Sequence, residues 1–83
     1  MNYEIEIGLK AKKVCTKLPK ETALRLMKKL RQLKENPFRY LEHFEGGGYK
    51  FRVGDYRALI DVDFTRKVLV LRVLDKRGRI YKR

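Results

Sequence analysis

Apolar and polar residues alternate along three segments in the C-terminal part of the chain, a pattern typical of β-strands with one buried face. The three segments are 49–53, 56–62 and 67–73. Gly54 and Asp55 separate the first two, and a two-residue Gly-X connection favours a tight β-hairpin. A polar turn at 63–66 leads into the third segment. The pattern therefore predicts three consecutive strands, each antiparallel to the next.

The lengths of the two turns set the register of these strands. If the first turn has only two loop residues, Arg52 lies opposite Arg57. If the second has two or four, Val62 lies opposite Lys67. Arg57 then lies opposite Arg72. Because side chains alternate between the two faces of a sheet, four cations are expected on one face and the apolar residues on the other. The four cations are Lys50, Arg52, Arg57 and Arg72.

A row of cations across neighbouring strands is unfavourable by itself, because like charges that face each other repel. An anionic partner outside the chain would neutralise this row, and the phosphates of RNA are the obvious candidate. The alternative is a basic face that is only solvated and is partly balanced by Asp61.

Helical periodicity predicts two helices before these strands. The first covers residues 9–18 and is expected to turn Leu9 inward. The second begins near Pro19 and ends at Asn36-Pro37, because proline disfavours helix in the residue before it. A short link between two helices favours a helical hairpin. The inner face of the second helix is predicted to consist of Ala23, Leu26, Met27, Leu30 and Leu33.

A short strand is predicted at residues 3–7, where Glu4 and Glu6 alternate with apolar residues. Two carboxylates at this spacing could bind a divalent cation or transfer protons. More often such a pair forms a solvent-facing strand edge that discourages aggregation. The structural reading is therefore preferred.

Residues 38–48 are predicted to form a loop that leads into the strands. The loop docks through its apolar residues, which are Phe38, Tyr40, Leu41 and Phe44. His43 in this loop has no Cys or His at ligand spacing, so no metal or cofactor is expected.

Cys15 is the only cysteine, which excludes an intramolecular disulfide and is typical of a reducing compartment. We expect it to fill space among apolar residues.

The charge balance narrows the range of partners. Lys and Arg number 22 against 10 acidic residues, a formal net charge of +12, which favours a polyanionic partner. No apolar segment approaches the roughly 18 residues of a membrane span, and no secretory leader is recognisable, so a cytoplasmic protein that does not enter membranes is expected. The 83 residues predict a single domain covering 1–83.

Several of these features together carry a family resemblance over nearly the whole chain. They are the short strand, the two helices, Asn36-Pro37, the Gly-rich lead-in at 46–48, the sequence R-V-G-D-Y-R at 52–57 and the ending RGRIYKR. In this combination the chain resembles the RelE toxins of the RelE/ParE superfamily, archaeal members in particular. The resemblance implies an α+β fold of order β-α-α-β-β-β, in which an antiparallel sheet of about four strands packs against an N-terminal helical hairpin. It also implies a toxin of a type II toxin–antitoxin system that enters the ribosomal A site and cuts mRNA without a metal, and a RelB-type antitoxin as partner.

The resemblance places the catalytic residues at Lys50, Arg52, Arg57, Arg77 and Tyr81. Arg57 and Arg77 would stabilise the charge that develops on the phosphate, because a guanidinium group matches phosphate oxygens. Lys50, crowded by other cations, would be the general base. Arg52 would hold phosphate, and Tyr81 would stack on a nucleobase or place the nucleotide. Further RNA contacts are expected at Lys28, Arg72, Lys76 and Arg79.

Two alternatives fit the same sequence. A ParE-type toxin would share the fold and would poison DNA gyrase without cutting RNA. A non-catalytic RNA- or ribosome-binding module would use the same cations for binding alone, and each of its cations would then contribute a graded share of affinity and of salt dependence.

Overall fold

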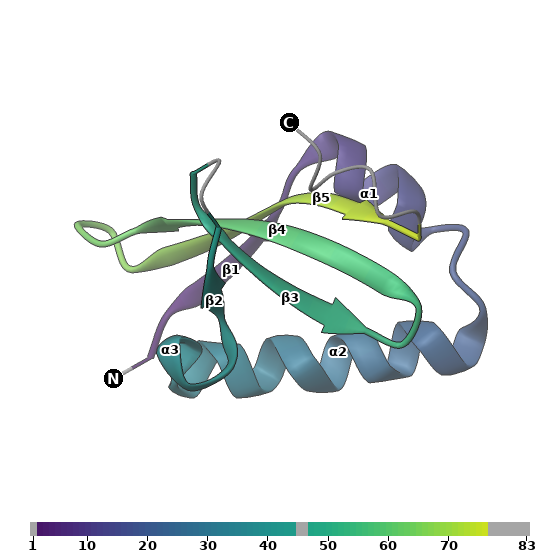
Figure 1. The fold of residues 1–83 in the computed structure, drawn as a ribbon, viewed down its shortest axis with the longest axis horizontal. Coiled ribbons are helices and arrows are strands. Elements are labelled where there is room, and N and C mark those ends of the chain that lie inside the picture. Colours follow the sequence, from purple (N-terminus) through teal and green to yellow (C-terminus); the bar gives the residue numbers. More distant parts are fainter. Residues whose placement is uncertain (1, 45–46, 77–83) are drawn as a thin grey trace.

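The computed structural model of the chain describes residues 2–44 and 47–76. Within these residues, five strands form one sheet in the order β1-β5-β4-β3-β2, and the helices pack against it (Figure 1). The elements are β1 (Glu4–Ile7), α1 (Leu9–Cys15), α2 (Lys20–Glu35), α3 (Pro37–Tyr40), β2 (Glu42–His43), β3 (Tyr49–Val53), β4 (Tyr56–Asp63) and β5 (Val68–Asp75). This is the α+β fold that the sequence predicts.

Two details of the sheet differ from the prediction. The segment 38–48 contains the short helix α3 and the two-residue strand β2, where a loop was expected. The sheet is mixed and not wholly antiparallel, because β1 runs parallel to β5, with Ile5 beside Leu69. β1 forms one outer edge of the sheet, and its Glu6 lies 3.5 Å from Arg66 across an exposed ion pair. Glu4 and Glu6 are both exposed, so they form a solvent-facing edge.

The first hairpin has the predicted register. Arg52 lies opposite Arg57, and Val53 lies opposite Tyr56. Of the two loop residues only Gly54 has a positive φ, at 58°, which is the requirement of a type II′ turn with glycine in its first central position. The turn therefore sets the pairing of β3 with β4.

The second hairpin differs from the prediction. Val62 lies opposite Leu69, not Lys67, and Arg57 lies opposite Asp75, not Arg72. The pairing shifts by one residue between Leu59 and Ile60, a β-bulge that leaves one residue of β5 without a partner in the register. That residue is Arg72.

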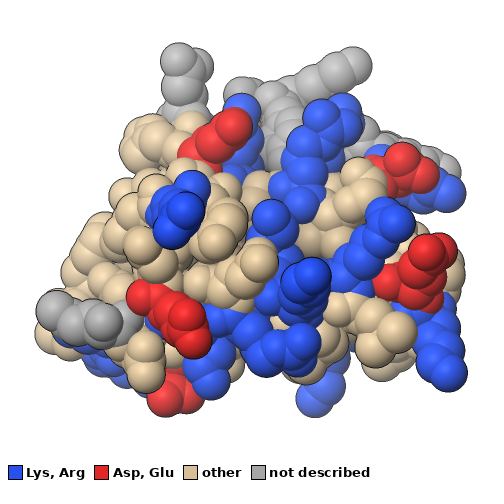
Figure 2. Space-filling model, turned by 90° about the horizontal axis from the view of Figure 1, so that it is seen from below, with Lys and Arg blue, Asp and Glu red and all other residues tan. Residues whose placement is uncertain are grey.

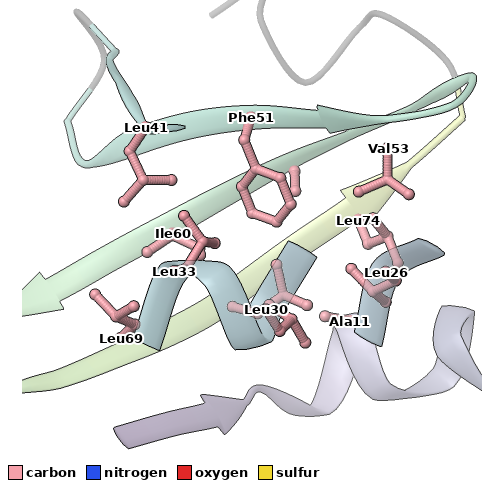
Figure 3. Close-up of a cluster of buried hydrophobic side chains, with 12 residues drawn as sticks. Ala11, Leu26, Leu30, Leu33, Leu41, Phe51, Val53, Ile60, Leu69 and Leu74 are labelled. Carbon is pink, nitrogen blue, oxygen red and sulfur yellow. The ribbon is translucent and has the colours of Figure 1, made fainter. Parts of the chain in front are cut away.

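The hydrophobic core lies between one face of the sheet and the helices (Figure 3). Leu26, Leu30 and Leu33 of α2 are all buried, at a spacing that keeps them on one side of the helix. Met27, which was predicted on this inner face, is 51% exposed, because the buried face of α2 is narrower than expected. The strands contribute Phe51, Val53, Ala58, Ile60, Leu69, Leu71 and Leu74.

The first helix is shorter than predicted and faces the core with a different residue. α1 ends at Cys15 and packs on β5 through Ala11, which is fully buried. Leu9 is 81% exposed, against the prediction, because a position two residues away lies on the opposite side of a helix. Cys15 is half-buried beside the core, and burial raises the pKa of its thiol.

The helix α3 fixes the start of the segment that crosses to the sheet. Pro37 occupies its first turn, where a missing N–H costs nothing. Phe38 anchors it, stacked on Phe64 at 5.8 Å and edge-on to Tyr49 at 5.5 Å. Tyr40 at its end is thereby held next to α2 and β3.

No helix in the described part of the chain has the length and apolar character to cross a membrane.

Candidate functional site

Three of the predicted catalytic cations lie on the sheet face opposite the core. In β3, Phe51 and Val53 point into the core, with 5% and 4% of their surfaces exposed. Lys50 and Arg52 alternate with them and therefore point to the other face. The pairing of Arg52 with Arg57 places the next strand's guanidinium on that same face.

These three cations border one hollow of about 500 Å³. Its walls come from α2, α3, β2, β3 and β4. β2 pairs only with Lys50 and Tyr49, so the outer edge of β3 beyond Lys50 has no strand beside it among the described residues. The lining residues of the hollow are Lys29, Tyr40, Glu42, Lys50, Phe51, Arg52 and Arg57.

Positive charge dominates the hollow. Four cations line it against one carboxylate, that of Glu42. Glu42 lies 3.9 Å from the Lys50 Nζ, so this ammonium group has a carboxylate beside it as well as the cations that the sequence predicts. Arg57 likewise has Asp75 opposite it on β5. An anionic ligand would meet an excess of three positive charges there.

An aromatic ring shares the hollow with these charges. The Lys29 Nζ lies 5.1 Å from the centre of the Tyr40 ring, within the range of a cation–π contact. Tyr40 is half-buried and packs against the core, which holds its ring in place. Lys29, Tyr40 and Glu42 are not among the predicted site residues, because each comes from a different element. The sequence places Lys29 only on the outward basic face of its helix, a face that could attract phosphates in general.

The basic surface continues over α2. Seen from the side of α2, Lys and Arg side chains form a nearly continuous patch across the middle of the molecule, with acidic side chains to either side (Figure 2). Lys28, a predicted RNA contact, is exposed on α2 but does not line the hollow.

The other predicted RNA contacts are less well placed. Arg72 forms an ion pair with Asp61, with 2.8 Å between Nε and Oδ2, and it does not line the hollow. Lys76 is exposed just beyond the end of β5 and does not line the hollow. Arg77, Arg79 and Tyr81 lie outside the described residues.

His43 makes a packing contact with a neighbouring aromatic ring. It belongs to β2, not to a loop, and its ring lies edge-on to Tyr49 at 5.5 Å. Within residues 2–44 and 47–76, no three His, Cys, Asp or Glu side chains gather where they could hold a metal ion.

Comparison with known proteins identifies the class to which this chain belongs. The model of a family described as "ParE toxin of type II toxin-antitoxin system, parDE" matches residues 5–80. The protein is a toxin of the type II toxin–antitoxin class, and the chain belongs to this ParE toxin family within the RelE/ParE superfamily. No curated protein sequence matches the chain.

Solved structures confirm the predicted likeness to RelE toxins. The archaeal RelE–RelB complex from Pyrococcus horikoshii has a chain 28% identical to this one with a TM-score of 0.79, and the match covers 95% of this chain and 99% of that one. The RelBE2 complex of Mycobacterium tuberculosis is similar in fold, at 22% identity, a TM-score of 0.83 and coverage of 93% and 100%. A free RelE mutant from E. coli matches at 22% identity and a TM-score of 0.75, over 99% of this chain and 93% of that one.

Proposed function

We propose that this toxin is a ribosome-dependent mRNA endoribonuclease that needs no metal and inhibits translation. The observation that carries the proposal is the convergence of Lys50, Arg52 and Arg57 on one hollow of the sheet. The likeness to the archaeal RelE of the RelE–RelB complex supports it. A surface that only attracts nucleic acid would not need three cations on two paired strands at one spot.

The proposed reaction uses the nucleophile that RNA itself carries. The 2′-oxygen attacks the neighbouring phosphorus and loses its proton to a base, for which Lys50 is the candidate. The bond from phosphorus to the 5′-oxygen breaks, and that oxygen takes up a proton. The products are a 2′,3′-cyclic phosphate and a 5′-hydroxyl end. Arg57 and Arg77 stabilise the extra charge on the phosphate, Arg52 holds the backbone, and Tyr81 places the nucleotide.

The lack of an efficient base explains why the ribosome would be required. Arginine stays protonated and is a poor proton acceptor, and a lysine ammonium must lose its own proton before it can act as a base. A ribosome can hold the mRNA backbone in line for attack, and orientation of this kind accelerates a reaction strongly. We therefore propose the A site as the place of cleavage and expect only weak activity on free RNA.

We also propose that a RelB-type antitoxin keeps the toxin inactive. The Pyrococcus horikoshii structure is a complex of RelE with RelB. A chain with a net charge of +12 suits a partner that brings acidic groups to its basic surface.

The decisive test of the nuclease is the Arg57→Ala variant. Removal of one transition-state donor typically lowers the rate by roughly 10²–10³-fold, and we expect a loss of that order. The assay translates an mRNA on purified ribosomes and maps its new 5′ ends. Arg66→Ala is the matched control, because Arg66 is an exposed arginine paired with Glu6, outside the hollow. Near-normal cleavage by Arg57→Ala would refute the proposed site.

A second candidate function is inhibition of DNA gyrase, and the description of the matching family favours it. The two activities separate in one experiment. Induction of the toxin in cells should produce new mRNA 5′ ends if it is a nuclease. Growth arrest without new ends, together with inhibition of purified gyrase, would assign the protein to the gyrase-directed toxins.

A further inference from the structure

The hollow contains more than the cations that a scissile phosphate requires. Tyr40, at the end of α3, is part of its wall and lies under the Lys29 Nζ. Both residues come from elements other than the strands that carry Lys50, Arg52 and Arg57. An aromatic ring and a cation, side by side, match the two parts of a nucleotide, which are a flat base and a phosphate.

We infer that Tyr40 is the stacking platform for the nucleobase next to the scissile phosphate and that Lys29 contacts a flanking phosphate. The inference deepens the proposed function and rests on it for the choice of RNA as the ligand. It assigns a positioning and specificity role within the hollow, separate from the groups that stabilise the reacting phosphate.

The geometry of the hollow supports a nucleotide as its occupant. A volume of about 500 Å³ lies within the range of small-ligand sites. The packing of Tyr40 against the core removes the entropy cost of ordering its ring. Lysine is a flexible point charge on a long stem, so Lys29 can leave the ring face when a base stacks there and can follow the phosphate.

A second aromatic–cation pair in the same molecule provides a contrast. The Lys67 Nζ lies 5.9 Å from the centre of the Tyr3 ring, and both residues line a smaller hollow of about 360 Å³. There, one cation is balanced by the carboxylate of Glu35. This hollow has an aromatic–cation pair like that of Tyr40 and Lys29 but no excess of positive charge. Tyr3 is therefore a matched control for Tyr40.

The test measures binding with RNA that cannot be cut. Short 2′-O-methyl RNA oligonucleotides carry a fluorescent label, and each member of a series lacks the base at one position. Fluorescence anisotropy with the wild-type protein should show one position at which loss of the base weakens binding roughly 5- to 150-fold, as expected for one stacked base. In Tyr40→Leu this dependence on position should vanish, whereas Tyr40→Phe, which retains the ring, should keep it.

The controls decide whether the effect belongs to the hollow. Tyr3→Leu should keep the full dependence on position. Lys29→Met should reduce the slope of log affinity against log salt by about 0.7, the value for one phosphate contact on a single strand. A dependence that persists in Tyr40→Leu, or is missing from the wild type, would overturn the role of Tyr40, and an unchanged slope would overturn that of Lys29.

A measurement on the unaltered protein guards against a variant that fails to fold. An oligonucleotide with 5-iodouracil at the sensitive position should photocrosslink to Tyr40 of the wild type, and a crosslink confined to other residues would contradict the assignment. Failure of the nuclease proposal remains distinguishable. Normal cleavage by Arg57→Ala would refute the nuclease site and leave the binding data intact. Cleavage of mRNA on the ribosome, together with RNA binding that does not depend on which base is missing, would refute the stacking site alone.

Discussion

Arg52 and Arg57 face each other across paired strands, a contact that costs stability unless other charges reduce it. Asp75 lies on the other side of Arg57, and Glu42 lies beside Lys50. These carboxylates lower the repulsion but leave an excess of positive charge in the hollow. At the scale of single residues, this concentration of like charge is the best indication of a phosphate site.

Gly48 makes a sharp prediction at the residue scale. A Cβ at this position would lie 2.8 Å from the backbone oxygen of Ile60 and 2.9 Å from the Asp61 Oδ1, and its φ is +81°. Gly48→Ala should therefore lower the free energy of unfolding by about 1–3 kcal/mol, measured by urea denaturation.

Gly47→Ala is the matched control for this change. Gly47 also has a positive φ, at 108°, but nothing lies within 4 Å of its Cβ position. Both variants strain the backbone, so the difference between them measures the close approach to β4. Equal losses in the two variants would show that this contact has no effect.

At the scale of elements, α2 has one apolar side that packs on the sheet and one basic side that faces solvent. One side buries Leu26, Leu30 and Leu33 against the sheet, and the other carries the basic patch (Figures 2 and 3). A helix of this kind gains its stability from packing, not from helix propensity alone. The position of Lys29 at the hollow thus depends on how firmly α2 docks.

Leu33→Ala tests that docking. Leu33 is fully buried, and truncation of such a leucine costs about 2–5 kcal/mol of unfolding free energy, because it loses transfer energy and leaves a cavity. Met27→Ala, at an exposed position of the same helix, should change stability by only about 0.5 kcal/mol or less. Thermal unfolding of both variants gives the comparison, and a Leu33→Ala protein as stable as Met27→Ala would contradict the core described above.

The pairing of β5 with β4 is a second feature that is set at the scale of elements. The second turn shifts the pairing of β5 by two residues from the prediction and the bulge adds one more, so Arg57 lies opposite Asp75. Arg72 has no partner in the register and lies 2.8 Å from Asp61. Because both partners are about half exposed, this ion pair contributes little stability. Its effect is to withdraw one of the four predicted cations from the hollow.

At the scale of the whole molecule, the net charge of +12 gives any encounter with RNA a long-range attraction that salt screens. If the four cations of the hollow each neutralise one phosphate, the slope of log affinity against log salt should be about −2.8 or steeper on single-stranded RNA. Anisotropy titrations at several salt concentrations measure this slope.

An uncharged morpholino oligonucleotide of the same sequence is the control for this prediction. It can stack but has no phosphates to release counterions, so its binding should depend little on salt. A flat salt profile for the RNA itself would mean that the basic surface serves another partner, such as the acidic face of an antitoxin.

The sequence predicted the residues of the sheet better than the surroundings of the site. The shared face of Lys50, Arg52 and Arg57 could be predicted because strand alternation is local and the Gly54-Asp55 turn sets one register. Their catalytic role stays a prediction. Lys29 and Tyr40 escaped prediction, since nothing in local spacing shows that the end of α3 lies beside the middle of α2. The exposed Leu9 was assigned inward because periodicity in a short helix leaves its rotation uncertain.

By itself, the sequence determined the α+β class, the β3–β4 hairpin, the limits of α2 and the excess of positive charge. These follow from periodicity, turn chemistry and composition, which act between near neighbours along the chain. Only the tertiary structure decided that β1 pairs in parallel with β5, that Arg57 faces Asp75 and not Arg72, and that Lys29, Tyr40 and Glu42 line a hollow beside Lys50. Such contacts depend on how distant elements pack around a shared core, and packing is a property of the whole fold.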